Sequence, residues 1–180
     1  FEEARISGVE VDLTLQFARD ARGIVEARVP SDDVDPGQTV PITVRLRHYG
    51  AGQDELRVVP IVVPPEAAGT DLEVGVLPGD DVTLEHADPR TLDQILSNVR
   101  ESLPSTSLVV SMRLPSRGLR FEGHLARELP GSAIDALTEV NGTDPPSSFP
   151  TERRTQVDAG HVLFGSARLH LHVRQVPRTR

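Results

Sequence analysis

The sequence predicts a mainly β protein of the α+β type, an immunoglobulin-like antiparallel β-sandwich with an inserted helix-hairpin-helix segment and closing C-terminal strands. Three observations lead to this prediction. Apolar and polar residues alternate with a period of two over several short stretches. Clusters of Pro, Gly and Asp separate those stretches at the spacing of a sandwich. Residues 88–140 interrupt the alternation with apolar residues at helical spacing.

The length and composition of the chain limit the size of its core and the chemistry it can carry. A chain of 180 residues can bury roughly 70% of its unfolded surface without covalent staples. We expect a sandwich-like portion at residues 5–77 and an α+β portion with closing strands at residues 78–175, packed as one compact unit. The absence of cysteine excludes disulfides, thiolate metal sites and a cysteine nucleophile.

The charge and hydropathy of the chain indicate which classes of partner to expect. The net charge is −8, aromatic residues make up 3% of the chain, and the 19 basic residues, all arginine, are scattered. Nucleic-acid binding needs a basic stripe, often with stacking aromatics, so we expect no nucleic-acid partner. No run of about 18 apolar residues occurs, and the sequence therefore predicts no membrane span.

The N-terminal half contains five predicted strands, at residues 9–17, 24–29, 39–49, 56–63 and 72–76. Residues 21–23 are expected to turn, and residues 30–38, rich in Asp, Pro and Gly, to form a loop. Within residues 39–49 the inward positions are Val40, Ile42, Val44 and Leu46. The nearly continuous apolar run at residues 56–63 predicts a strand covered on both faces, although Pro60 interrupts it.

The middle of the chain contains the helical patterns. Asp88 can cap a helix with Pro89 at its first position, and the apolar face that follows is expected to pack against the sheets. That face consists of Leu92, Ile95, Leu96 and Val99. Residues 108–114 then alternate as a strand, residues 115–118 are expected to turn into a hairpin, and residues 133–140 return to helical spacing.

The C-terminal part returns to β patterns. Residues 141–154 are polar and contain three prolines, which predicts an exposed loop. Strands are predicted at residues 155–157, 161–164 and 167–175. In the last strand Ala167, Leu169, Leu171 and Val173 point inward, and Arg168, His170, His172 and Arg174 point outward.

The outward histidines are the first candidate site. His170 and His172 lie on one strand face about 7 Å apart, a separation at which two imidazoles can chelate zinc. A site needs a third and a fourth ligand, and His161, Asp158 and His48 are available only by residue type. Arg168 and Arg174 share the face and oppose a cation, so a solvated strand face is the simpler interpretation and no metal is predicted.

The second candidate site is an acidic loop. Asp32, Asp33 and Asp35, followed by Gly37, resemble a loose calcium loop, because alternating carboxylates can wrap a hard cation. The full twelve-residue pattern with a terminal glutamate is missing, and an ordinary turn has the same composition. Asp80 and Asp81 could contribute only if the fold brings the two loops together. A calcium-stiffened adhesion module stays open as an alternative.

Nucleophilic catalysis has little support in the sequence. The G-x-S-x-G pattern of a strained serine turn is absent. Gly165-Ser166 lies between two predicted strands, and Gly131-Ser132 precedes a predicted helix. The sequence therefore predicts no catalytic residue and no cofactor. The enzyme alternative is a hydrolase whose catalytic residues lie outside this fragment, or a site built around His170 and His172.

Several blocks together carry a family resemblance over nearly the whole chain. They are Val34-Asp-Pro-Gly-Gln-Thr-Val40, Val44-Arg-Leu-Arg-His-Tyr-Gly50, Val58-Val-Pro-Ile-Val-Val-Pro64, Leu92 with Ile95-Leu96, Leu108-Val-Val110, Gly123 with Leu129-Pro-Gly-Ser132, and Gly165-Ser-Ala-Arg-Leu-His-Leu-His-Val173. In order and spacing they resemble the region that follows the peptidase domain in exported bacterial proteins with a SpoIVB-type serine peptidase domain.

The resemblance has restrictive implications. In such proteins the catalytic serine and histidine belong to the upstream domain, so no catalytic residue is carried over to this chain. The resemblance implies a non-catalytic accessory module that scaffolds or binds, with a protein partner or the parent's own peptidase domain as its target, in a periplasmic or extracellular location. Because the chain begins Phe1-Glu2-Glu3, without an initiator methionine or a signal peptide, we expect it to be a piece of a longer protein.

Overall fold

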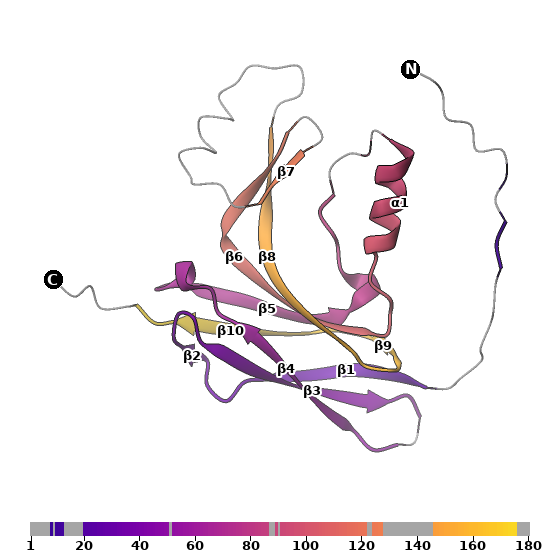
Figure 1. Cartoon of the computed structure of the whole chain (residues 1–180). Helices are drawn as coiled ribbons and strands as arrows, with labels where there is room; N and C mark the ends of the chain where they lie inside the picture. Colours follow the sequence, from indigo (N-terminus) through magenta and orange to yellow (C-terminus); the bar gives the residue numbers. More distant parts are fainter. Residues whose placement is uncertain are drawn as a thin grey trace.

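The computed structural model describes residues 8, 10–12, 20–50, 52–86, 89, 91–121, 124–127 and 146–175. The protein is mainly β, with two sheets and one α-helix among these residues (Figure 1). The strands are β1 (Ala21–Arg28), β2 (Asp33–Val34), β3 (Thr39–His48), β4 (Glu55–Val62), β5 (Asp71–Pro78), β6 (Ser107–Phe121), β7 (His124–Ala126), β8 (Ser147–Asp158), β9 (Val162–Phe164) and β10 (Ala167–Val173). The helices are α1 (Leu92–Glu101) and the short 3-10 turns η1 (Pro65–Ala67) and η2 (Gly79–Asp81).

The strands form two sheets of different size. The smaller has the order β4-β3-β1-β9, and the larger the order β2-β10-β5-β6-β7, with β8 also paired to β6. The pairings are antiparallel except β1 with β9 and β2 with β10, which are parallel. The mainly β prediction is therefore confirmed, and strands from residues 5–77 and 78–175 share both sheets. The immunoglobulin-like assignment stays a prediction.

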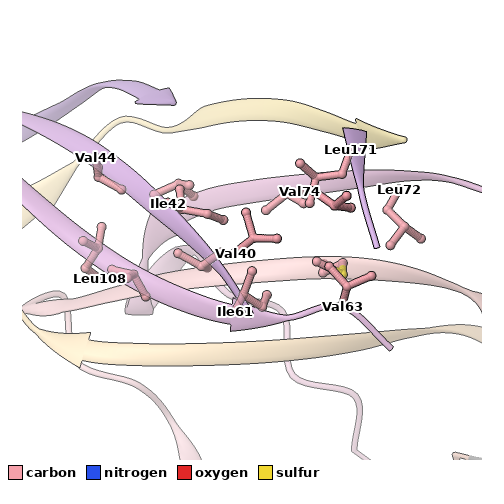
Figure 2. Packing of buried hydrophobic residues seen from close by; sticks show 14 of the residues in the cluster. Val40, Ile42, Val44, Ile61, Val63, Leu72, Val74, Leu108 and Leu171 are labelled. Atoms are coloured by element: carbon pink, nitrogen blue, oxygen red, sulfur yellow. The ribbon is translucent and has the colours of Figure 1, made fainter. Parts of the chain in front are cut away.

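The core lies between the two sheets. Figure 2 shows side chains of β3 and β4 packed together with side chains of β5, β6 and β10. The predicted inward face of β3 is confirmed, because Val40, Ile42, Val44 and Leu46 are at most 1% exposed. Leu171 and Val173 on β10 are fully buried as well. Each such aliphatic side chain stabilises the fold by roughly 1.5–3 kcal/mol.

Strand β4 is covered on one face only, so the expectation of burial on both faces is wrong. Val59 and Ile61 point into the core, whereas Leu56, Val58 and Val62 are 64%, 60% and 42% exposed. The physical reason is position: β4 is the edge strand of the smaller sheet, and the outer face of that sheet has no further layer among the described residues.

Strand β6 continues where the sequence predicted a turn. The expected hairpin at residues 115–118 is wrong, because β6 runs unbroken through this segment and its pairing with β8 shifts register between Arg113 and Arg117. A bulge accommodates the extra residues without ending the strand. Residues 147–154, predicted as part of a loop, belong to β8. The long-range pairing of β8 with β6 overrides the local turn signals.

Helix α1 is confirmed, but its predicted start is wrong. Thr91, rather than Asp88, is the N-cap: its hydroxyl accepts from the Gln94 backbone N–H at 3.3 Å, and the Gln94 side chain accepts from the Thr91 N–H at 3.2 Å. This reciprocal capping box satisfies two free N–H groups, which a start at Pro89 would not do. Asp88 lies outside the described residues.

The apolar face of α1 does not pack against the sheets as expected. No α1 residue is buried, and the four apolar side chains are 42% to 65% exposed. In the view of Figure 1, α1 is drawn to the right of β6 and β8, and none of its side chains is buried against a sheet. The helix is connected to the sheets by the segments that follow η2 and precede β6, and its apolar face stays exposed.

The predicted turn at residues 21–23 is wrong, because strand β1 begins at Ala21. Of the predicted strand at residues 9–17, the described residues 10–12 are in no strand, and the remainder lies outside the described residues. The predicted helix at residues 133–140 also lies outside them.

Candidate binding surfaces

The outward face of β10 carries the predicted histidine pair. His170 and His172 are both exposed and alternate with inward residues as expected. The Nδ1 atom of His172 lies 2.7 Å from Oδ1 of Asp71 on β5, and His170 is in register with Glu73. The hydrogen-bond partner of His172 is therefore a carboxylate on the neighbouring strand.

The acidic loop lies next to the same histidine. Strand β2 pairs with β10 so that Asp33 is in register with His172, and the His172 backbone N–H donates to the Asp32 carbonyl at 2.7 Å. Asp35 forms an ion pair with Arg174 at 3.3 Å. The structure thus brings the two candidate sites together into one row across three strands, Asp33, His172 and Asp71.

The two carboxylates in this row affect the pKa of the His172 imidazole. The hydrogen bond that the ring makes to the Asp71 carboxylate raises the pKa of His172 above its usual value, and the charges of Asp71 and Asp33 act in the same direction. The row therefore favours a protonated imidazole held between two carboxylates. A metal ligand needs the opposite, a neutral imidazole.

The other proposed ligands do not join this row. Among the described residues no group of three or more His, Asp or Glu side chains has a metal-holding arrangement. Asp158 accepts from the Gly160 N–H of its own turn. Asp80 and Asp81 follow the last residue of β5, whereas Asp33 is level with the first, a separation of about 23 Å from strand rise.

Two of the remaining histidines lie near one end of the smaller sheet. The Nδ1 atom of His161 is 2.7 Å from Asp20 and its Nε2 atom is 3.9 Å from Glu55, which also pairs with Arg22 at 2.9 Å. His48 is directly opposite Arg22 in the ladder of β1 and β3. This is an ion-pair network at the edge of the core, on the other sheet from His170 and His172.

A shallow hollow of about 270 Å³ lies on the outer face of the larger sheet. The residues that line it include Gly75, Ser111, Glu73, Arg113 and Arg168. The Ser111 hydroxyl donates to Glu152 at 2.5 Å, and Glu152 also pairs with Arg154. Because this serine is bonded to a carboxylate and not to an imidazole, the hollow lacks the hydroxyl–base contact of a nucleophilic site among the described residues.

The outer face of the smaller sheet is different, since it combines apolar side chains with paired charges. On β4 the exposed residues form a continuous apolar row of Leu56, Val58, Pro60 and Val62. On the opposite side of the same face lies an apolar corner, where the Tyr49 and Phe164 rings meet edge to face with centroids 6.2 Å apart. Val25 and Val162, 40% and 50% exposed, extend that corner.

A ladder of ion pairs separates the apolar row from the apolar corner. Arg45 contacts Glu26 at 3.1 Å and Asp54 at 2.9 Å, and Arg47 contacts Asp54 at 3.3 Å. Hydrogen bonds from Arg28 and from Arg47 lower the pKa of Glu26 and of Asp54 respectively, so both carboxylates stay charged. The charges of this face largely satisfy one another, so within the part of the chain that the structure describes the apolar side chains are the groups of this face that have no packing layer over them.

Sequence reasoning missed this surface because Leu56, Val58 and Val62 have the composition of buried residues. The signal that could have found them is Pro60, since proline inside a strand pattern indicates an edge strand, and an edge strand of a sandwich is often open on one face. Asp71 was missed because its place beside His172 depends on strand register.

Comparison with known proteins gives no family for this chain. No family model matches it, and neither a curated protein nor a solved structure is significantly similar. Among the described residues, no helix is long and apolar enough to cross a membrane.

Proposed function

We propose that this chain is a non-catalytic accessory domain that binds a protein partner through the outer face of its smaller sheet. The observation that carries the proposal is the apolar row on β4 together with the apolar corner at Tyr49 and Phe164, all on one face. Clustered exposed apolar groups that are flanked by polar residues are typical of protein-binding surfaces. The ion-pair ladder between them supplies the polar contacts that fix orientation.

The parent protein is proposed to be an exported bacterial protein with a SpoIVB-type peptidase domain upstream of this chain, located in the periplasm or outside the cell. The order and spacing of the sequence blocks between Val34 and Val173 support this assignment. The partner is then the parent's own peptidase domain. Tyrosine and aliphatic side chains on an open sheet face fit a second folded domain better than a small ligand.

The test has two stages. The reading frame of the parent gene should encode a SpoIVB-type peptidase domain upstream, and a frame without one would contradict the family assignment. Calorimetric titration of this domain with the separately produced peptidase domain should then show binding. Val58→Arg should weaken that binding at least tenfold, because it places a charge in the apolar row.

Gln156→Arg is the matched control, since it adds the same charge at an exposed position of β8 on the other sheet. It should leave the affinity unchanged. Equal losses in Val58→Arg and Gln156→Arg, or none in either, would show that the outer face of the smaller sheet is not the binding surface.

A further inference from the structure

The apolar stripe of α1 is spaced for pairing with another helix. Leu92, Ile95, Leu96 and Val99 occupy positions i, i+3, i+4 and i+7, and they are 50%, 47%, 42% and 65% exposed. This spacing is that of helices that bury a stripe against a groove or a second helix. Because the capping box already holds the helix, little conformational entropy would be lost on pairing.

The two flanks of this stripe differ in charge. At 100° per residue, Asp93 and Arg100 lie on one flank, seven residues apart, and Thr91 and Asn98 lie on the other. Neither Asp93 nor Arg100 has an ion-pair partner among the residues that the structure describes. Asn98 is the α1 residue that is not exposed, so the neutral flank leans towards the body and the charged flank points away from it.

We propose that two copies of this chain associate through α1 in an antiparallel pair about a two-fold axis. In that arrangement Leu92 packs against Val99 of the second copy, and Ile95 against Leu96 of the second copy. Antiparallel pairing brings like flanks together, so Asp93 faces Arg100 of the second copy and Arg100 faces its Asp93. The antiparallel dimer therefore gains two ion pairs in addition to burying the apolar stripe of each copy.

The charges beside the stripe favour a second copy of this chain as the partner of α1, and they favour the antiparallel orientation. In a parallel pair the charged flank would meet the neutral flank of Thr91 and Asn98, and neither ion pair would form. The stripe of this helix is self-complementary only in the antiparallel orientation. An anionic membrane surface is disfavoured, because α1 contains Asp93 and Glu101 against a single Arg100.

The size of the contact sets its strength. A helix of 10 residues is about 15 Å long, so the pair buries less area than a stable dimer interface. The association is therefore weak, with a dissociation constant on the order of 0.1 mM. It would be strengthened in a parent protein that holds several copies close together.

Sedimentation equilibrium over a concentration series tests the proposal on the chain as it stands. The wild type should show a monomer–dimer equilibrium, and Leu96→Asp should abolish it without lowering the melting temperature, because Leu96 is not buried in the monomer. Asp93→Arg and Arg100→Asp should each weaken the dimer about tenfold, since each replaces two attractions by two repulsions. Thr39→Arg, which adds a charge at an exposed position of β3 in the smaller sheet, should leave it unchanged.

The decisive arm mixes the two charge variants. Asp93→Arg presents two positive residues and Arg100→Asp two negative ones, so an equimolar mixture should form heterodimers at least as well as the wild type forms homodimers. The double variant Asp93→Arg/Arg100→Asp should recover the homodimer. A chain that stays monomeric up to about 1 mM, a dimer insensitive to Leu96→Asp, or a mixture that fails to associate would each overturn the proposal.

Discussion

Pro41 on β3 and Pro60 on β4 are directly opposite each other in the ladder of the smaller sheet. The neighbouring bond from Val63 N–H to the Gln38 carbonyl, at 2.9 Å, fixes the alternation of bonded and non-bonded pairs along these strands. By that alternation the two prolines form a non-hydrogen-bonded pair, so their nitrogens point away from each other. The nitrogen of Pro60 then faces the free edge of β4 and removes a donor there.

Pro60→Thr should therefore make the free edge of β4 competent for pairing with other chains. The substitution restores an N–H between those of Val58 and Val62, and exposed, unbroken, apolar edges are aggregation sites. We expect faster growth of light scattering on mild heating, with the free energy of unfolding changed by less than about 1 kcal/mol. Pro41→Thr is the matched control because its nitrogen does not face that edge. Equal aggregation of both variants would contradict the edge interpretation.

The pair of His172 and Asp71 predicts a pH dependence. The pKa of His172 is raised in the folded state, so its interaction with Asp71 contributes fully below the unfolded value of roughly 6.5 and is lost as pH rises through the folded pKa. Asp71→Asn should move the pKa of His172 down towards its usual value, as measured by NMR titration of the imidazole. The stability advantage of the wild type over Asp71→Asn should shrink over the same window as the pH increases.

Substitution of the neighbouring acidic residues, one at a time, tests whether Asp71 is the principal partner of His172. Asp33→Asn should lower the pKa of His172 by less than Asp71→Asn, because Asp33 acts through its charge alone whereas Asp71 also accepts the hydrogen bond. Glu73→Gln, which is in register with His170, should have the smallest effect. The reverse order would show that Asp71 is not the principal partner of the ring.

The parts of the fold that could be predicted from the sequence are those where one face is buried. Strands β3 and β10 bury every second side chain, and α1 has an apolar stripe, so the period alone predicts these elements. The continuation of β6 through residues 115–118 could not be predicted, because the partner strand β8 is about thirty residues away and supplies the contacts that outweigh the local turn residues.

The candidate sites show the same limit. The outward orientation of His170 and His172 follows from strand alternation, but the row with Asp33 and Asp71 requires the register of β2 and β5 against β10. The exposed residues of β4 have the same composition as its buried ones, and only the place of β4 at the edge of the sheet separates them. The period of apolar residues in the sequence predicts which residues share a face, whereas the long-range pairing of strands determines what covers that face.

Gly79 provides a stability prediction at the base of the α1 segment. A Cβ atom at this position would lie 2.4 Å from the Pro104 carbonyl oxygen and 2.8 Å from the Leu103 Cβ. Since backbone must move to relieve this contact, Gly79→Ala should lower the free energy of unfolding by roughly 1–3 kcal/mol. Urea denaturation measures the change, with Gly8→Ala, which has no atom within 4 Å, as the control. An unchanged urea midpoint for Gly79→Ala would refute the close approach.

Thr151, a polar residue that is only 7% exposed, lies opposite the bulge of β6. Its hydroxyl donates to the Ser116 carbonyl at 2.8 Å and lies 2.7 Å from the Ser116 hydroxyl. Thr151→Val keeps the shape but removes the donor from a part-buried carbonyl, which should cost about 1–3 kcal/mol in urea denaturation. Ser116→Ala keeps the bond to the carbonyl and should cost less. If the two variants are equally destabilised, the hydroxyl–hydroxyl contact, rather than the bond to the carbonyl, holds the bulge.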